Sequence, residues 1–348
     1  MKKILYEFAG RGIWLINYIT FKFKRNDKET VIFDTDKQTE NLGDFVIMGY
    51  CNHILRDLFP GKGEIHISTH VIPHKNDEKK VQKSKYKFVC GTNLLTSTIE
   101  KWWNWRLPDG FKRKLKYRNA ILFGVGWGNY QDECSDYSRF IYRALLNPCV
   151  LHSVRDSYTE EKLKAAGIKN VINTGCPTMW RLNRSFCESI PVSKAPDVVT
   201  TVTDYRREIE RDNLMLQILG RNYRKVYLWL QGNQDQEYIK QLNLPGNCIV
   251  LTRNLKSFEE KLQSGFVDYV GTRLHAGIYA LNHRVRSIII AVDNRAIEIA
   301  KDTNLPMVMG DKLHMELEAM LSSDFRTDIT LNIDNIHLFL EQFRKKGH

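Results

Sequence analysis

The residues best suited to chemistry in this sequence are Arg273 and His275, two positions apart. They follow the apolar run Val267–Val270, which predicts a strand, and precede small residues that are typical of a helix start. Amide groups at a helix start favour anions, and a guanidinium offers a planar fork for carboxylate or phosphate. An imidazole titrates near neutral pH and suits a general acid. With Thr272, this pattern predicts an anion site, although a capping arginine and a backbone-bonded histidine fit it equally well.

A second strand-to-helix junction places Arg155 at a strand end. The run Val150–Val154 predicts the strand, and either Asp156 or Ser157 is able to cap the helix that follows. Because Asp156 or Ser157 supplies the cap, no local structural role explains Arg155. We therefore expect its side chain at the carboxyl end of the strand. A surface ion pair with Asp156 is the alternative.

Two glycine-containing turns come after other predicted strands. Asn41 and Gly43 suit a tight turn, and we expect Asp44 to cap the next helix. The loop around Gly126 has the sequence Gly-Val-Gly-Trp-Gly, similar to phosphate-cradling loops, but it lacks the dinucleotide spacing and the Walker lysine. These four residues are candidates for a ligand cleft.

Tryptophan and basic residues alternate between positions 101 and 118. This mixture suits a membrane interface or nucleic acid, and a solvated basic face over buried tryptophans explains it as well. The residues we single out for peripheral membrane contact are Trp102, Trp103, Trp105, Lys112, Arg113 and Lys114.

Composition narrows the class of protein. The 348 residues exceed the usual size of one hydrophobic core, and 52 Lys and Arg against 40 Asp and Glu give a net charge of +12 that attracts anions. Seven scattered cysteines, without a CxxC pair or an HExxH motif, predict neither a disulfide framework nor a metal site. An apolar stretch near the N-terminus is interrupted by charges, so we expect neither a signal peptide nor a membrane-spanning helix.

The elements that must position these residues alternate between short apolar runs and helical patterns. This alternation predicts an α/β fold with mostly parallel sheets. A turn-rich stretch at Ile190–Pro196 predicts the linker, giving an N-terminal domain over 1–190 and a C-terminal domain over 191–348. The last helix is a candidate to pack back on the first domain. Two facing units of this kind bind ligands in the cleft between them.

Taken in order, these segments resemble the polysaccharide pyruvyl transferase family. The resemblance extends from Asn41 to Leu305, and its most specific element is Thr272-Arg-Leu-His-Ala. It implies two facing Rossmann-like domains similar to GT-B glycosyltransferases, an acceptor-side N-terminal domain, and phosphoenolpyruvate as the donor in place of any cofactor. The implied product is a pyruvate ketal on a surface polysaccharide or its lipid-linked precursor.

The resemblance also implies roles for single residues. Arg155, Thr272, Arg273 and Arg295 correspond to donor-binding positions, and His275, as the acid, and Arg273 correspond to catalytic positions. Asn41, Gly43, Asp44 and Gly126 correspond to cleft or acceptor positions. Two departures stand out. Cys176 occupies a position where the family carries an acid, and Arg295 replaces a lysine.

Two other functions remain open from the sequence. A sugar-nucleotide glycosyltransferase fits the same two-domain shape, and a basic membrane-docked binding module fits the Trp-Lys cluster. The expected location is the cytoplasm, with peripheral contact at the inner face of the membrane, and the expected partners are phosphoenolpyruvate and a glycan acceptor, not nucleic acid.

Overall fold

The computed structural model describes residues 2–24 and 28–344, and the chain forms two compact units. The first unit contains Met1–Thr39, Ile47–Pro177 and Asn332–His348, and the second contains Glu40–Val46 and Thr178–Leu331. The predicted boundary at residue 190 does not coincide with this division. Thr178 accepts a hydrogen bond from Asn282 and Ser189 accepts one from Arg284, so the segment before the turn-rich stretch is tied to the second unit.

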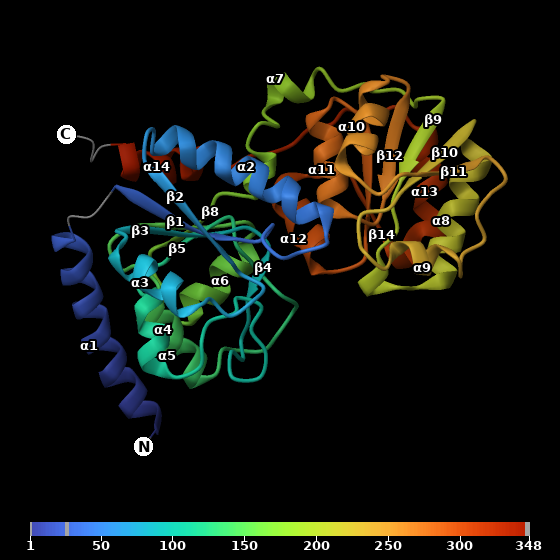
Figure 1. The fold of residues 1–348 in the computed structure, drawn as a ribbon. Coiled ribbons are helices and arrows are strands. Elements are labelled where there is room, and N and C mark those ends of the chain that lie inside the picture. The colour runs from blue at the N-terminus through green and yellow to red at the C-terminus, as the bar shows by residue number, and fades with distance from the viewer. Residues whose placement is uncertain (1, 25–27, 345–348) are drawn as a thin grey trace. The chain divides into compact units, whose positions relative to one another are not determined.

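The first unit is built on a parallel sheet with the strand order β2-β1-β3-β5 (Figure 1). β7 lies beside β5, because the amide of Gly124 donates to the carbonyl of Ser153 at 3.0 Å, and β8 pairs with β7. The short strands β4 and β6 pair with each other. The bounds are Glu29–Asp34 (β1), Gly63–Ser68 (β2), Tyr86–Cys90 (β3), Asn93–Leu95 (β4), Ile121–Phe123 (β5), Gly126–Trp127 (β6), His152–Val154 (β7) and Val171–Asn173 (β8).

Helices cover both faces of this sheet, since its strands are apolar on both sides. One face packs on α3 and α5 through a core that includes Val31, Val81 and Ile141, and α1 packs outside α5. On the other face, Phe339 of α14 stacks on Phe123, and Phe343 packs edge-on against Phe88. The helices are Lys2–Phe23 (α1), Leu42–Leu58 (α2), Lys75–Lys83 (α3), Phe111–Lys114 (α4), Asp136–Leu145 (α5), Ser157–Ala165 (α6) and Ile333–Arg344 (α14).

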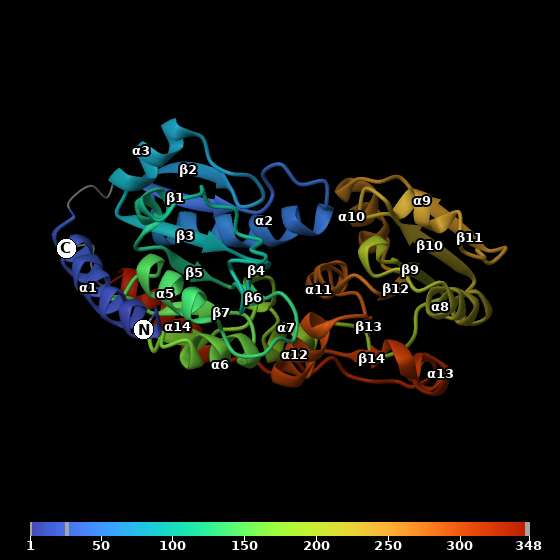
Figure 2. The same cartoon turned by 90° about the horizontal axis from the view of Figure 1, so that it is seen from below.

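The second unit has a six-stranded parallel sheet with the order β11-β10-β9-β12-β13-β14 (Figure 2). Numbered within the unit, this is the order 3-2-1-4-5-6 of dinucleotide-binding Rossmann folds. The strands are Asp197–Thr200 (β9), Lys225–Trp229 (β10), Cys248–Leu251 (β11), Val267–Gly271 (β12), Ser287–Ala291 (β13) and Met307–Met309 (β14).

Helices also cover both faces of the second sheet. α8 and α13 lie together on one face, where Leu216 and Leu317 enter the core, and α10 and α11 lie on the other (Figure 1), where Phe258 stacks on Trp229 with centroids 4.1 Å apart. The helices are Arg184–Cys187 (α7), Ile209–Asn222 (α8), Asp235–Ile239 (α9), Leu255–Gln263 (α10), Leu274–Asn282 (α11), Asn294–Thr303 (α12) and Leu313–Ser322 (α13). Within the described residues, no helix has the length and apolarity needed to cross a membrane.

Candidate active site

The second unit carries its candidate site at the carboxyl end of the sheet, where β9 and β12 are neighbours. The chain proceeds from β9 outward to β11 and then crosses back to β12, so the winding direction reverses at this pair. Ligands of doubly wound sheets bind beyond the strand ends at such a switch point. Thr272 and Arg273 follow β12 directly, and His275 is the second residue of α11. Three of the predicted site residues therefore share this edge.

Arg273 joins three loops of this edge and is 2% exposed. Its Nε donates to the carbonyl of Val202 at 2.9 Å, and its Nη2 donates to the carboxylates of Asp204 at 2.9 Å and Asp235 at 2.6 Å. Burial acts to lower the pKa of the guanidinium, but Asp235 and the other neighbours outweigh burial and leave the pKa raised. Arg273 is therefore charged, and it ties together the loops that follow β9, β10 and β12.

The loop after β10 folds tightly around Asp235. Its carboxylate accepts the amides of Gln231 at 2.8 Å and Gly232 at 2.7 Å, besides the bond from Arg273. Burial raises the pKa of Asp235, and the positive charge of Arg273 opposes that shift. A Cβ atom on Gly232 would collide with the side-chain ends of both Asp204 and Arg273, so an alanine here would force these two groups to shift.

Tyr205 brings the two predicted donor-binding arginines of this unit to one place. The Cζ atoms of Arg273 and Arg295 lie 5.0 and 5.4 Å from the centroid of its half-exposed ring. Arg295 also donates to the hydroxyl of Tyr205 and, from Nε, to Asp293 at 3.0 Å. Burial acts to lower the pKa of Arg295, but Tyr205 and Asp293 together leave it raised. Two guanidinium groups therefore flank one aromatic ring beside the switch point.

His275 lies in the first turn of α11, where its side chain is 6% exposed. The amide of Gly277 donates to the carbonyl of Arg273 at 3.1 Å, which is the first bond of the helical ladder. The backbone amides that come before Gly277 in the first turn are therefore not part of this ladder. The hydroxyls of Thr272 and Thr203 are 2.8 Å apart and join the ends of β12 and β9. An imidazole thus stands at the positive end of a helix, next to the strand end that Arg273 holds.

The predicted turn at Asn41 belongs to the second unit. The Oδ1 of Asn41 accepts the amide of Gly43 at 3.1 Å and the Nε2 of Gln231 at 2.8 Å. The prediction that Asp44 caps the helix is wrong, because α2 already begins at Leu42 and Asn41 makes the capping bond. Asp44 lies buried in the first turn of the helix.

The first unit presents Arg155 at the carboxyl end of β7, and this side chain is 1% exposed. Its Nε donates to Asp156 at 3.1 Å, and its Nη2 donates to the side-chain oxygen of Asn93. Asp156 also caps α6 by accepting the amide of Thr159 at 2.7 Å, which decides between the two predicted caps. The Nη1 of Arg155 is buried and has no hydrogen-bond partner among the described residues. A buried charged donor without a partner is the kind of group that a ligand oxygen satisfies.

Gly126 makes room for Arg155. A Cβ atom at this position would fall on the guanidinium, only 2.2 Å from its Cζ and Nε atoms. The sequence placed Gly126 in a loop that resembles a phosphate cradle, and the structure gives it a different task. It shapes the pocket of an arginine rather than wrapping an anion with its own amides.

A titratable cluster at the ends of β1 and β2 was missed by sequence reasoning. The Nδ1 of His66 is 2.6 Å from a carboxylate oxygen of Asp34, whose other oxygen accepts the amide of Asp36 at 2.8 Å. Burial acts to raise the pKa of Asp34, but hydrogen bonds from His66 and Asp36 leave it lowered. Burial and the neighbouring Asp34 raise the pKa of Asp36 to about 6. The available signal was Asp34, a carboxylate at the last position of a buried strand.

The family model described as polysaccharide pyruvyl transferase matches residues 41–294, which is more than half of the chain and includes Arg155, Arg273 and His275. The chain belongs to the polysaccharide pyruvyl transferase family. A search of curated protein sequences finds no significant match.

Two of the solved structures that match this chain are epimerases. UDP-GlcNAc 2-epimerase from Methanocaldococcus jannaschii, solved with UDP-GlcNAc and UDP, gives a TM-score of 0.52 at 11% identity over 91% of this chain and 98% of that chain. The enzyme from Neisseria meningitidis, bound to UDP-GlcNAc, gives a TM-score of 0.43 at 12% identity over 86% of this chain and 94% of that chain. The first likeness confirms the predicted GT-B-like fold with two Rossmann-like domains.

One departure from the family pattern has a clear structural setting. Cys176, where the sequence resemblance led us to expect an acid, is 1% exposed at the end of the first unit. The following Pro177 packs so closely on Gly124 that a Cβ atom there would collide with it. The position is therefore a packing position in this chain.

The predicted membrane contact through the Trp-Lys cluster is wrong for two of its tryptophans. Trp103 and Trp105 lie in the core of the first unit, 6% and 1% exposed, with ring centroids 5.4 Å apart. Arg113 forms an ion pair with the buried Glu78. Only Trp102 of the three tryptophans is exposed, and the guanidinium of Arg106 covers one face of its ring. Indoles that fill a core are not available to a lipid surface.

Proposed function

We propose that this family member transfers the pyruvyl group of phosphoenolpyruvate onto a sugar of a surface polysaccharide or its lipid-linked precursor, forming a pyruvate ketal with His275 as the general acid. The observation that carries the proposal is the position of His275. It stands in the first turn of α11, next to the strand end that Arg273 holds in place. A proton donor beside the positive end of a helix suits an anionic enol phosphate.

The chemistry requires two hydroxyl groups of one acceptor sugar. Protonation of the donor methylene carbon forms the methyl group and makes the adjacent carbon electrophilic, and the first hydroxyl attacks that carbon. The bond to the phosphate oxygen then breaks, and the second hydroxyl closes the ketal. Two hydroxyl protons leave in total, one for the methyl group and one for the released phosphate. His275 passes the first of these protons, which suits an imidazole near neutral pH.

The arginines take different parts in this proposal. Arg273 acts as a positioning residue, because its Nε and Nη2 are engaged by a carbonyl and two carboxylates. Arg295 beside Tyr205 and the first-turn amides of α11 stabilise negative charge on the donor. Arg155 offers a buried Nη1 donor for a further anionic oxygen. Preorganised donors of this kind stabilise developing charge without reorganisation.

Donor binding separates this proposal from glycosyl transfer, which the Rossmann strand order of the second unit also permits. The melting temperature of the protein is measured with phosphoenolpyruvate and, separately, with UDP- and GDP-sugars. A donor at 100 times its dissociation constant adds about 2.7 kcal/mol to the free energy of unfolding. We expect stabilisation by phosphoenolpyruvate alone. Stabilisation by a sugar nucleotide alone would replace pyruvyl transfer with glycosyl transfer.

The role of His275 is tested by phosphate release from phosphoenolpyruvate in the presence of a panel of glycan acceptors. His275→Ala should lower the rate by about 10²–10⁴-fold and keep the thermal shift with phosphoenolpyruvate, because the acid acts in the chemical step. The matched control is His283→Ala, at the C-terminal end of the same helix, which should leave the rate unchanged. A His275→Ala variant with the wild-type rate would remove the histidine from the mechanism.

A further inference from the structure

Helix α1 has one face fixed on the first unit. Tyr6 stacks on Phe140 of α5 with centroids 5.1 Å apart, and the Nδ2 of Asn17 donates to the carbonyl of Ala144 at 2.9 Å. Phe21 near the end of the helix is buried and packs edge-on against Tyr86. These contacts set the rotation of the helix about its own axis, and thereby decide which side chains point away from the protein.

The outward face of α1 is a stripe of large apolar side chains. Their spacings of three, four and seven residues, with one adjacent pair, place them on one face of the helix. We call this face the α1 stripe, and it consists of Leu5, Phe8, Leu15, Ile16, Ile19 and Phe23, with exposed fractions from 46% to 78%. Helices on the surface of soluble proteins carry polar residues on the outward face, and contiguous apolar patches mark interaction sites.

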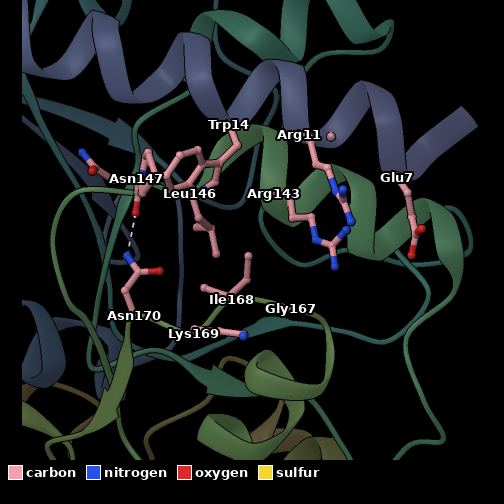
Figure 3. A pocket seen from close by; sticks show the side chains of 12 residues that line it. Glu7, Arg11, Trp14, Arg143, Leu146, Asn147, Gly167, Ile168, Lys169 and Asn170 are labelled. Carbon is pink, nitrogen blue, oxygen red and sulfur yellow. Dashed lines mark hydrogen bonds between the residues drawn. The ribbon is translucent and has the colours of Figure 1, made fainter.

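A basic pocket lies alongside the helix (Figure 3). Its cavity of about 430 Å³ is lined by α1, by the end of α5 and by the loop that leads to β8. Arg11 of α1 and Arg143 of α5 point the same way at its rim, and Lys169 lies across from them. No ion pair of Arg11 or Arg143 with a described carboxylate is found, although Glu7 lies on the same helix. The charge of the pocket therefore complements an anion.

We propose that α1 docks this protein on an anionic lipid bilayer, with the α1 stripe in the acyl boundary and the pocket at the level of the lipid phosphates. Trp14, half-exposed at the pocket rim, suits the interface between the two. An amphipathic helix with basic residues beside its apolar face lies in the plane of the membrane surface. The occupant is a bilayer rather than a protein, because the cations stand beside the stripe, where headgroups lie.

The docking is separate from the shared machinery of the family. The family model begins at residue 41, so the whole of α1 lies outside the matched region. Docking places the first unit at the surface where a lipid-linked acceptor resides, but it does not depend on the identity of the donor. The membrane surface of this chain is thus α1 and not the Trp-Lys cluster.

Sedimentation with lipid vesicles tests the proposal on the full chain. Wild-type protein should bind vesicles that contain phosphatidylglycerol, bind vesicles of pure phosphatidylcholine less, and lose affinity as salt is raised. The double variant Phe8→Glu, Leu15→Glu should bind at least about tenfold more weakly, since two apolar side chains leave the interface. Arg11→Glu should reduce the preference for phosphatidylglycerol and keep binding to neutral vesicles.

Trp102→Glu is the matched control, because it places the same charge at the one exposed tryptophan of the Trp-Lys cluster. This variant should bind like the wild type. All substituted side chains are exposed, so circular dichroism and the melting temperature should stay unchanged. Absence of wild-type binding, or loss of binding in Trp102→Glu alone, would overturn the proposal. A wild-type dimer that the double variant converts to a monomer would assign the α1 stripe to a second copy of the chain.

Discussion

Arg155 and Arg273 occupy equivalent places in the two units and differ in what surrounds them. Each follows a buried parallel strand, precedes a helix and is at most 2% exposed. Arg273 meets two carboxylates, whereas Arg155 meets one carboxylate and one amide and keeps an unpaired Nη1. The same local sequence pattern therefore has two outcomes. Arg273 holds the loops of the second unit together, whereas Arg155 keeps an N–H donor that an anion can use.

A glycine lies against each of the two arginines, but the groups around it differ between the two units. Gly126 makes room for the guanidinium of Arg155, and Gly232 for the contact between Arg273 and Asp204. In the second unit the space is filled by the carboxylate itself. In the first unit the backbone approaches the arginine without bringing a second negative group, so the positive charge stays partly uncompensated.

The largest expected effect separates the two arginines by stability. Arg273→Met should lower the free energy of unfolding by about 3–5 kcal/mol, because it leaves Asp235 and Asp204 buried without their cation. Arg155→Met should have a smaller effect, because Asp156 keeps its capping bond to Thr159. Urea unfolding of the two variants beside the wild type measures both changes.

Ligand binding gives the same pair of variants a second readout. Arg155→Met should reduce the thermal shift with phosphoenolpyruvate while its unliganded melting temperature stays close to the wild type. Equal loss of stability in the two variants would show that Arg155, like Arg273, mainly stabilises the folded structure. An unchanged thermal shift in Arg155→Met would remove it from donor binding.

Much of the fold could be predicted because its signals are local. Runs such as Lys225–Leu230 and Val267–Val270 contain the residues needed for buried parallel strands, and the structure places strands there. The unit boundary could not be read in the same way. The chain crosses between units three times, at Glu40, Ile47 and Thr178, before Asn332 returns it to the first unit. Only contacts between residues far apart in the sequence reveal those crossings.

The candidate site shows where sequence reasoning stops. The strand-end positions of Arg155 and Arg273 follow from a buried run next to a helix start, and both were predicted. The partners of Arg273 are Asp204 and Asp235, which come from separate loops, and no spacing rule connects them. Burial of Trp103 in the core likewise depends on neighbours far along the chain. The apolar residues of α1 are evident in the sequence, where Glu7 and Arg11 argue against a membrane-spanning helix. Which of these residues point outward depends on distant contacts such as that of Tyr6 with Phe140.

Acid should weaken the first unit through His152, which lies in β7 directly before the loop of Arg155. Its Nδ1 accepts the amide of Leu122 at 3.1 Å and its Nε2 donates to the carbonyl of Asn147 at 3.0 Å, so the ring is neutral. Burial lowers the pKa of His152 to about 4. The unfolded chain binds the proton more readily between about pH 6.5 and 4, so stability is present above this window and falls by up to about 3 kcal/mol through it.

Urea unfolding near neutral pH and at about pH 5 measures this loss. His152→Gln should make the free energy of unfolding less dependent on pH in this range. His66 provides the opposite sign within the same unit. The hydrogen bond with Asp34 raises the pKa of His66, so its contribution is present at low pH and is lost as pH rises through the raised pKa. A variant His152→Gln with the acid sensitivity of the wild type would assign the loss to other groups.

Substituting the two glycines tests whether both arginines depend on close backbone contact. Gly232→Ala should lower the free energy of unfolding by about 1–3 kcal/mol, because the methyl group forces Asp204 and Arg273 apart. Gly126→Ala should displace the guanidinium of Arg155 and weaken the thermal shift with phosphoenolpyruvate. Gly12→Ala is the control, since nothing lies near its Cβ position on α1. If Gly126→Ala binds the donor as the wild type does, the placement of Arg155 is not what donor binding requires.

The smallest expected effect concerns Asn41, which the structure assigns to the edge of the second unit. Asn41→Ala removes the acceptor of the Gly43 amide and of the Gln231 side chain, and should lower the free energy of unfolding by about 1 kcal/mol. Asn41→Asp keeps a carboxylate oxygen for both donors and should stay close to the wild type. Hydrogen exchange should show faster opening at Gly43 and at the Gln231 loop in Asn41→Ala, because these groups lose their shared partner. Faster exchange confined to the first unit would instead show that residues 40–46 unfold together with that unit. Asn41 would then not stabilise the loops around Arg273.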